Sequence, residues 1–508
     1  MTEQRTPEAL YEKVCEHVRQ TALLEGVNAL LEWDDRTIIP AKAGKHRAEQ
    51  ITLLSGILHQ RRTAPELGEW LNQLIDSPLA ADPHSDTGAN IRLLKRDYDK
   101  NVKLPQRLVE ELARTTVRAQ QVWTEAREKD DFAAMQPWYE KIVALKQEEA
   151  DALGYEQQRY DALLDYYEPG EVTANVSRVL AGLREDLVPL VAVIVDSGRQ
   201  ADTSILERRY PVDVQEQFGR RAAELIGFDF TRGRLDVTAH PFCSGMGPDD
   251  CRITTRYDEH FFNTALFGIL HEAGHGLYEL GLRGEQYGLP AGQSTSLGIH
   301  ESQSRMWENL VGRSHAFWEY LYPQAQRAFP EALTDTSLDD FYFAINAVQP
   351  SLIRVEADEA TYNLHILIRF ELEQDLIEGR LKVADLPGAW NEKYRDYLGI
   401  TPPNNCDGVL QDIHWSAGLI GYFPTYSLGN LYASQFFEQA RHDLGDLDAQ
   451  FRQGRFDNLL QWLREKIHRR GRCYSAAELA EVVTGKPLSH QPLITHLKSK
   501  FGPLYGIA

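Results

Sequence analysis

The sequence predicts a mainly α fold, and three observations support that prediction. Apolar residues recur at spacings of three and four through most of the chain. One stretch, residues 234–258, instead has short β-branched and polar runs around a Gly-rich turn. The breaks are short loops rich in Pro, Gly, Asp and Asn, and none is a low-complexity linker. We therefore expect one mainly helical domain over residues 1–508, which can divide into two lobes.

The first predicted helix, residues 7–32, shows the periodicity clearly, because Leu10, Val14, Val18 and Ala22 follow one another four residues apart. The same pattern predicts helices at 44–61, 104–128, 138–154, 172–196, 212–226, 259–280, 298–320, 351–378, 427–443 and 476–485. Loops are expected at 77–89, 281–297 and 399–408. We interpret residues 234–258 as a small β-hairpin whose open edge could hold an extended peptide. The alternative is a surface hairpin without such a role.

Composition excludes several classes of protein. The 508 residues include 54 basic and 75 acidic side chains, a net charge of −21, which argues against nucleic acid as a partner. No apolar run approaches the roughly 20 residues of a membrane span, and the N-terminus lacks the apolar core of a signal peptide. Five scattered cysteines without a CxxC pair fit neither a disulfide framework nor a thiolate zinc site. These features predict a soluble protein of the reducing cytoplasm.

The segment with recognisable chemistry is residues 267–280, FGILHEAGHGLYEL, which contains HExxH from His271 to His275. Histidines four residues apart lie one helical turn apart on the same side, so both rings can hold one metal ion. Glu272 lies on the adjacent face, where it can act on a water molecule without ligating the metal. The alternative is that both histidines are ordinary residues of a helix surface.

The rest of this predicted helix is consistent with a metal site. An apolar stripe lies almost opposite the two histidines and consists of Phe262, Leu266, Ile269 and Ala273. Gly268, Gly274 and Gly276 each cost helix stability, about 1 kcal/mol relative to alanine. Three such residues in one helix predict that another segment approaches its backbone closely.

A zinc hydrolase needs three protein ligands and one open position. Tyr278 and Gly281 stand where a metzincin would continue with Gly and His, so that class is excluded. We expect the third ligand to be Glu301, in the amphipathic segment 299–309, which completes a thermolysin-type set. His300 and Glu308 are the alternatives, and Glu308 could instead lie outside the ligand set.

This ligand set predicts hydrolysis of a peptide or other amide bond. The ion lowers the pKa of its water and polarises the carbonyl oxygen. Glu272 then serves as the general base and returns the proton to the leaving amine, and a Tyr, His or Arg donates a hydrogen bond to the oxyanion. The motif leaves open whether cleavage is internal or terminal.

Further motifs follow one another in order through residues 240–435. They are HPF (240–242), D-x-R-x-T (250–254), HEAGH (271–275), HESQ (300–303), I-R-x-x-A-D (353–358), GVLQDIHW (408–415) and GYFPTYSLGNLYASQ (421–435). With these motifs, and with EWDDRTIIPAKAGKHRAEQ in its N-terminal half, the sequence resembles the thermostable metallocarboxypeptidases typified by Taq carboxypeptidase. The resemblance implies a large helical zincin-like fold with a deep active-site groove and a small β-hairpin or sheet near the metal. The motif-bearing catalytic region would be residues 234–435.

The resemblance also implies the activity and the site. Members of that family release single amino acids from peptide C-termini, with broad specificity and poor action next to proline. A homodimer is implied, with one divalent ion per subunit, zinc or cobalt, held by His271, His275 and Glu301, and with Glu272 as the base. The substrate-binding residues implied by the motifs are His240, Pro241, Phe242, Asp250, Arg252, Thr254, Arg354, Gln411, His414 and Tyr422.

Elementary chemistry suggests individual roles for some of these residues. A carboxypeptidase must bind a terminal carboxylate, which the two-pronged guanidinium of arginine does best. Arg354 is the preferred candidate, Arg252 is the other, and a structural ion pair within residues 355–358 is the alternative role for Arg354. We expect Tyr422 to donate to the oxyanion, with His414 as the second candidate. A core or stacking role is the alternative for either residue. His240 either touches the substrate or only shapes the hairpin.

Two competing interpretations remain at this point. A helical zinc oligopeptidase that cuts internal bonds would share HExxH and a distant glutamate. A catalytically silent metal-binding scaffold would share the ligands alone. The hairpin residues Cys243 and Cys251, where the family usually has Thr and Val, predict that activity is sensitive to thiol reagents.

Overall fold

The structure is a computed structural model that describes residues 6–507 and separates into two compact units. Within the described residues, unit 1 comprises 6–102, 202–345 and 436–486, and unit 2 comprises 103–201, 346–435 and 487–507. The predicted mainly helical fold is confirmed. None of the described helices combines the length and apolar character needed to cross a membrane.

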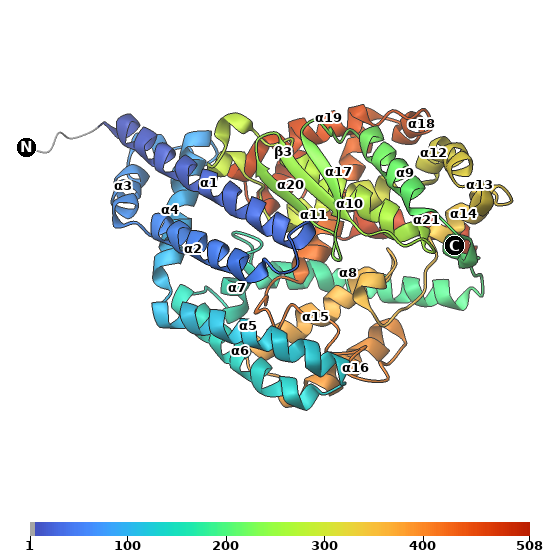
Figure 1. Cartoon of the computed structure of the whole chain (residues 1–508), viewed down its shortest axis with the longest axis horizontal. Helices are drawn as coiled ribbons and strands as arrows, with labels where there is room; N and C mark the ends of the chain where they lie inside the picture. The colour runs from blue at the N-terminus through green and yellow to red at the C-terminus, as the bar shows by residue number, and fades with distance from the viewer. Residues whose placement is uncertain (1–5, 508) are drawn as a thin grey trace, which may run out of the picture. The chain divides into compact units, whose positions relative to one another are not determined.

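Unit 1 begins with four helices, α1 (Pro7–Thr37), α2 (Gly44–Arg62), α3 (Pro65–Ile75) and α4 (Asp86–Lys103), of which α1 and α2 run side by side (Figure 1). Its central elements are α9 (Val212–Leu225), three strands, α10 (Phe262–Glu279) and α11 (Leu297–Arg305). The π-helix η5 (Met306–Val311) continues α11 without a break. The remaining helices of unit 1 are α12 (His315–Ala328), α13 (Pro330–Leu333), α14 (Leu338–Ile345), α18 (Leu447–Phe451), α19 (Asp457–Lys466) and α20 (Ala476–Thr484). Short 3-10 helices are η1 (Pro78–Ala80), η2 (Thr203–Glu207), η3 (Gly284–Gln286), η4 (Pro290–Gly292) and η8 (His468–Cys473).

Unit 2 consists of helices and the loops between them, with no strand among its described residues. Its helices are α5 (Gln106–Glu128), α6 (Phe132–Leu153), α7 (Arg159–Leu164), α8 (Thr173–Asp196), α15 (Tyr362–Ile377), α16 (Leu386–Leu398) and α21 (Gln491–Tyr505). Two 3-10 helices, η6 (Arg354–Glu356) and η7 (Val383–Asp385), lie between them in sequence. Helix α17 (Pro424–Leu444) begins in unit 2 and continues into unit 1. Stacked and edge-to-face aromatic rings fill the core of unit 2, where Trp390 contacts both Tyr394 and Trp415.

A three-stranded sheet accompanies the helices of unit 1. The strands are β1 (Gly233–Val237), β2 (Cys243–Gly247) and β3 (Asp250–Thr255), in the order β1-β3-β2. The predicted hairpin is the antiparallel pair β2–β3, which turns at Pro248 and Asp249, where Asp249 has a φ of 64°. Strand β1 lies almost wholly within the segment 234–258 that was predicted as a hairpin, but it pairs with β3 in parallel and is not part of the hairpin. The sheet packs on α10, so β2 is an edge strand beside the HExxH helix.

The apolar stripe of α10 anchors that helix in the core of unit 1, as expected. Phe262 is buried among the rings of Tyr210, Phe329 and Phe341, with centroid distances of 5.0, 5.8 and 5.5 Å. Leu266, Ile269 and Ala273 follow on the same stripe and are buried as well. Because this buried face fixes the position and rotation of α10 in unit 1, it also fixes where the histidines on the opposite face lie.

Two predicted helices differ from the structure. Residues 298–320 were expected as one helix, but η5 and the turn at 312–314 interrupt it, and Ser314 caps the new helix α12 by accepting a hydrogen bond from the Phe317 N–H. Residues 351–378 were expected as one helix, but α15 begins at Tyr362. The carboxylate of Asp358 accepts from the Ala360 and Thr361 N–H groups and so stabilises a turn in front of α15.

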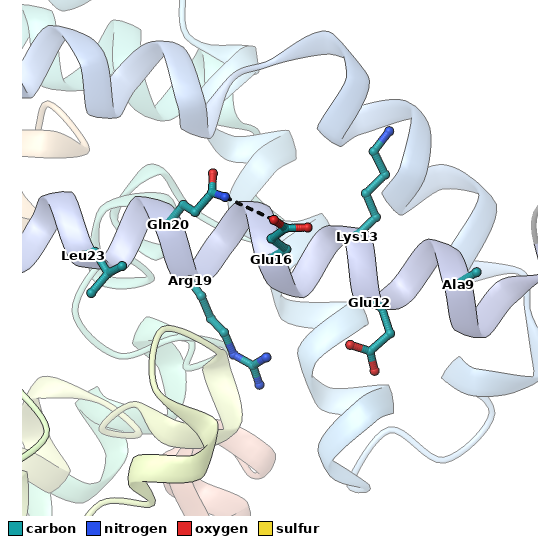
Figure 2. Close-up of a pocket in the computed structure, with 7 residues that line it drawn as sticks. All are labelled: Ala9, Glu12, Lys13, Glu16, Arg19, Gln20 and Leu23. Atoms are coloured by element: carbon teal, nitrogen blue, oxygen red, sulfur yellow. Dashed lines mark hydrogen bonds between the residues drawn. The ribbon is translucent and has the colours of Figure 1, made fainter.

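A hollow lies along the exposed side of α1 (Figure 2). It is lined by Ala9, Glu12, Lys13, Glu16, Arg19, Gln20 and Leu23. Gln20 donates a hydrogen bond to Glu16 there, with a distance of 3.3 Å. None of the predicted site residues lines this hollow.

Candidate metal centre

Helix α10 places His271 and His275 one above the other, as the HExxH spacing predicts. Their ring centroids lie 4.9 Å apart and their planes are nearly perpendicular. Both side chains are mostly buried, with exposed fractions of 19% and 15%. The Nε2 atom of each ring is directed at the same carboxylate oxygen, which belongs to Glu301.

Glu301 reaches this position because α11 crosses α10 closely and because a side-chain N-cap fixes where α11 begins. Ser296 caps α11 by accepting a hydrogen bond from the Ile299 N–H. Glu301 Oε2 then lies 3.6 Å from Nε2 of His271 and 3.4 Å from Nε2 of His275. Its second oxygen, Oε1, accepts a hydrogen bond from Nε of Arg305 at 2.7 Å.

These three donor atoms fit a metal ion. Ligand atoms about 2.0–2.2 Å from a tetrahedral zinc ion lie roughly 3.3–3.6 Å apart, as Glu301 Oε2 and each of the two Nε2 atoms do. Within the part of the chain that the structure describes, His271, His275 and Glu301 are the one group of three or more such side chains whose donor atoms converge. The set of two imidazoles and one carboxylate is also the one that the sequence predicted.

Charge favours the ligand form of Glu301. Burial raises the pKa of this carboxyl, but Arg305 and the two imidazoles outweigh burial and hold the pKa well below its usual value. Glu301 is therefore an anion over the neutral pH range, which is the form that a divalent cation requires.

Glu308, one of the alternative ligands, binds the outer nitrogen of His271 instead. Its Oε2 lies 2.9 Å from Nδ1 of His271 and 3.4 Å from NH1 of Arg305. The π-helix η5 carries Glu308, and such a turn shifts the side chains that follow relative to α11. The contact with Glu308 at Nδ1 thus holds the His271 ring with Nε2 directed at Glu301 Oε2.

His300, the other alternative, lies on the outer side of His275. Its Nδ1 is 2.6 Å from Nδ1 of His275, and its Nε2 is 2.7 Å from Oε1 of Glu279. Glu308 and His300 therefore contact the Nδ1 atoms of His271 and His275, whereas Glu301 lies near the Nε2 atoms of both rings.

Glu272 occupies the adjacent face of α10 and is buried. No described residue donates a hydrogen bond to its carboxylate, so the oxygens are free to accept from a water molecule or substrate. Burial raises the pKa of Glu272 to about 7, with His271 opposing and Glu301 adding to the shift. A carboxyl with a pKa near neutrality can both take and return a proton.

The expected close approach to α10 occurs at two of its three glycines. A Cβ at Gly274 would lie 2.7 Å from the Gln303 carbonyl oxygen and 2.7 Å from the Ser304 Cα, both backbone atoms of α11. A Cβ at Gly276 would lie 2.6 Å from the Phe228 ring. At Gly268 the nearest atom would be 3.6 Å away, which is ordinary contact.

Gly274→Ala should therefore destabilise the chain and weaken metal binding, because α11 must move away and carry Glu301 with it. We expect a loss of about 1–3 kcal/mol, typical of an overpacked contact. Gly268→Ala is the matched control in the same helix and should be neutral or gain about 1 kcal/mol. Thermal unfolding and zinc affinity of the two variants check this, and equal stability would contradict it.

The HPF and D-x-R-x-T motifs meet on the sheet of unit 1. Thr254 accepts a hydrogen bond from the Phe242 N–H at 2.8 Å and donates to the Phe242 carbonyl at 3.0 Å, so it fixes the HPF backbone. Arg252 forms two 3.0 Å hydrogen bonds with Asp250 and lies over the buried ring of Trp33. His240 and Pro241 are exposed at the start of this segment.

Cys243 and Cys251 lie on neighbouring strands of the same sheet. Their Sγ atoms are 3.4 Å apart and both are free thiols. The hydrogen bond between them and burial raise the pKa of Cys243 well above its usual value. A thiol with a raised pKa, such as that of Cys243, reacts slowly at neutral pH.

Arg354 lies in unit 2 as part of a buried charge cluster. Its Nε and NH2 donate to Oδ1 of Asp412 at 3.0 and 2.8 Å, and its NH1 donates to the Tyr362 hydroxyl. Arg369 pairs with the other oxygen of the same carboxylate. Two guanidinium groups thus share one carboxylate, and the alternative ion pair within residues 355–358 is absent from the described structure.

The other residues expected from the second half of the motif series surround this cluster. Gln411 accepts from the Arg354 N–H at 2.9 Å. The ring centroids of His414 and Tyr422 lie 5.6 Å apart. Burial lowers the pKa of His414 to about 4, although the negative charge of Asp412 acts to raise it. His414 is therefore a neutral imidazole. Tyr422 lies against Tyr167 and Tyr426 as well.

Sequence reasoning missed two charged residues of these sites. Arg369 is the one Arg in the otherwise apolar run ILIRF (366–370), and a lone charge at a buried helix position is a recognisable signal. Arg305 lies four residues after Glu301, the spacing at which two helical side chains meet. The contact between His300 and Glu279 has no comparable signal in the sequence.

Comparison with known proteins finds relatives along almost the whole chain. A family described as "Carboxypeptidase Taq (M32) metallopeptidase" matches residues 13–501. Thermostable carboxypeptidase 1 of Thermus thermophilus is 50% identical over 511 residues, which cover 99% of this chain and 100% of the relative. Carboxypeptidase 1 of Bacillus subtilis is 40% identical over 94% of this chain and 95% of its own length. The crystal structure of the M32 carboxypeptidase from Deinococcus radiodurans R1 superposes with a TM-score of 0.95 at 39% identity, covering 98% of this chain and 100% of that chain.

Proposed function

We propose the following chemistry for this chain, which belongs to the carboxypeptidase Taq (M32) metallopeptidase family. The chain is a metal-dependent carboxypeptidase, a hydrolase that acts on peptides. The relatives are named as carboxypeptidases, so neither an oligopeptidase nor a silent scaffold is favoured. The single observation that carries the chemistry is the convergence of three donor atoms from His271, His275 and Glu301.

These three residues hold one divalent ion per chain in our proposal, with zinc favoured and cobalt as the alternative. Imidazole nitrogen and carboxylate oxygen suit zinc, and three protein ligands leave a fourth position open. The bound ion supplies Lewis acidity, which polarises the scissile carbonyl and acidifies water. The protein residues supply the proton transfers and the recognition of substrate.

Glu272 acts as general base and then as general acid. It takes a proton from the attacking water and returns that proton to the leaving amine. Its free carboxylate and its pKa of about 7 support both steps. Glu272 lies beside the ligands in the sequence, yet it stays out of the converging set.

Arg354 binds the terminal carboxylate of the substrate in our proposal. The support is the charge balance of its cluster, in which Arg354 and Arg369 together face the single carboxylate of Asp412. One positive charge is left over in a buried place, and an anionic ligand would neutralise it. Gln411, whose side chain accepts from the Arg354 N–H, keeps that residue in place.

Tyr422 is our candidate donor to the oxyanion, with the neutral imidazole of His414 as the reserve. The edge strand β2 and the HPF segment, His240, Pro241 and Phe242, would hold the peptide backbone. Asp250, Arg252 and Thr254 would support that segment, as their contacts with one another and with Phe242 suggest.

Other features of the proposed function follow from the family resemblance and the composition. We propose broad specificity with poor action next to proline, release of single amino acids from free C-termini, and a homodimer. The whole chain would act as one peptidase domain, with its catalytic region at 234–435. Five free cysteines support a reducing cytoplasm as its location.

The test is a time course by mass spectrometry on one peptide, with either a free or an amidated C-terminus. We expect a ladder that shortens one residue at a time from the free C-terminus, no products from the amidated peptide, and no products after chelation. Internal fragments from both peptides would show an oligopeptidase and would leave Arg354 without its proposed role. Intact peptide in the presence of bound metal would contradict catalysis altogether.

A further inference from the structure

His300 occupies a position between a metal ligand and a carboxylate. It precedes Glu301 on α11, and its ring lies 4.6 Å from the ring of His275, centroid to centroid. Its two nitrogens contact different partners, since Nδ1 meets Nδ1 of His275 at 2.6 Å and Nε2 meets Oε1 of Glu279 at 2.7 Å. His300 therefore uses both nitrogens away from the metal position and cannot be the third ligand in this arrangement.

The proton positions in this chain of contacts follow from the ligand role of His275. A metal ion at Nε2 of His275 needs the lone pair of that atom, so the ring proton lies on Nδ1. Nδ1–H of His275 must then donate, and Nδ1 of His300 must accept. His300 consequently carries its own proton on Nε2, and this N–H donates a hydrogen bond to Oε1 of Glu279.

We propose that His300 and Glu279 are positioning residues, which fix the tautomer and the ring plane of the metal ligand His275 through two consecutive hydrogen bonds. This inference rests on the proposed metal centre and adds a function for two residues outside it. Outer hydrogen bonds of this kind orient a metal-bound histidine and raise its basicity.

The position of Glu279 supports a role of this kind. It is the last residue of α10, where the helix dipole disfavours a negative charge. Its carboxylate is confined there, because a Cβ on Gly245 of strand β2 would lie 2.9 Å from Glu279 Oε2. An unfavourable helix position together with a confined carboxylate is expected where a specific acceptor is needed.

The two metal-binding histidines thus differ in their supports. His271 donates directly to the carboxylate of Glu308, which Arg305 also contacts. His275 reaches its carboxylate only through the ring of His300. His300 lies in close contact with the donor Nδ1 of His275, and its removal would leave a mostly buried N–H without that acceptor.

Zinc affinity, measured by competition with a chelator at one fixed pH, tests this inference. His300→Leu removes both hydrogen bonds and should weaken zinc binding about 10–100-fold. His300→Asn keeps an acceptor near the former Nδ1 and should lose less than about tenfold. Glu279→Gln keeps an oxygen acceptor but no charge, and it should lose about tenfold at most.

The matched control is His315→Leu in the same unit. His315 makes the same type of contact, with Nδ1 2.8 Å from Glu319 Oε1, but it touches no metal ligand. This variant should bind zinc as the unaltered protein does. The visible spectrum of the cobalt-loaded forms is a second readout, which should change in His300→Leu and not in His315→Leu. A role in folding alone would leave that spectrum unchanged.

The outcomes separate this inference from the proposed function. If the unaltered protein binds zinc and His300→Leu binds it equally well with the same cobalt spectrum, the positioning role is wrong and the metal centre stands. If the unaltered protein binds no zinc, the proposed metal centre fails and the inference fails with it. Should His300→Leu not fold, the zinc affinities of His300→Asn and Glu279→Gln are compared with that of the control His315→Leu. Weaker binding than the control supports the positioning role, and binding as tight as the control in both variants contradicts it.

Discussion

Glu272→Gln is expected to lower kcat about 10²–10⁴-fold while the metal stays bound. Glutamine has nearly the same shape as glutamate and can still accept a hydrogen bond from water. It cannot take the proton that the attacking water must lose, nor return it to the leaving amine. The free carboxylate of Glu272 and its raised pKa are the structural reasons to place that proton there.

The measurement is kcat on a peptide with a free C-terminus, together with the zinc content of the same samples. Glu301→Gln is the matched comparison, because it changes a neighbouring buried carboxylate that lies in the ligand set. We expect it to lose zinc, whereas Glu272→Gln keeps it. Full activity in a zinc-loaded Glu272→Gln protein would contradict the assigned mechanism.

Asp412→Asn is expected to be strongly destabilising, by about 3–5 kcal/mol, because it leaves two buried arginines without their shared anion. Arg369 is fully buried and Arg354 nearly so. Burial raises the pKa of Asp412, but Arg369 and Arg354 outweigh it and hold the pKa well below its usual value, so the group is an anion. An uncharged amide cannot neutralise either guanidinium.

Calorimetry at one scan rate measures this effect. In a compact unit of the size of unit 2, each kcal/mol of lost stability lowers Tm by roughly 2–4 °C. The expected shift in Tm is therefore about 6–20 °C. Asp375→Asn is the control in the same unit, since Asp375 pairs with Arg380 at the surface and should contribute less than about 1 kcal/mol. Equal Tm values for the two variants would be the result against this interpretation.

Local patterns account for much of what the sequence predicted. His271 and His275 needed only a helical spacing of four, and the stripe from Phe262 to Ala273 needed only the helical period. The structure brings Glu301 to the same point, although that residue comes from a separate helix. Its prediction depended on residue type and chemistry rather than on spacing.

The parts that sequence reasoning missed depend on how elements cross. His300 and Glu308 were both candidate ligands, and their places behind the histidines follow from the close crossing at Gly274 and from the π-helix η5. Strand β1 joins the sheet by parallel pairing with β3, a contact between segments that no local turn signals. Asp412 was predicted only within a motif, and its role became visible when Arg369 was placed beside it.

The proposed metal centre is tested most directly by anomalous diffraction from a crystal of the zinc-loaded protein at the zinc absorption edge. We expect one peak per chain, about 2.0–2.2 Å from Nε2 of His271, Nε2 of His275 and Oε2 of Glu301. His300 and Glu308 should remain on the outer ring nitrogens. A peak bonded to His300 or to Glu308, or no peak at these three atoms, would contradict it.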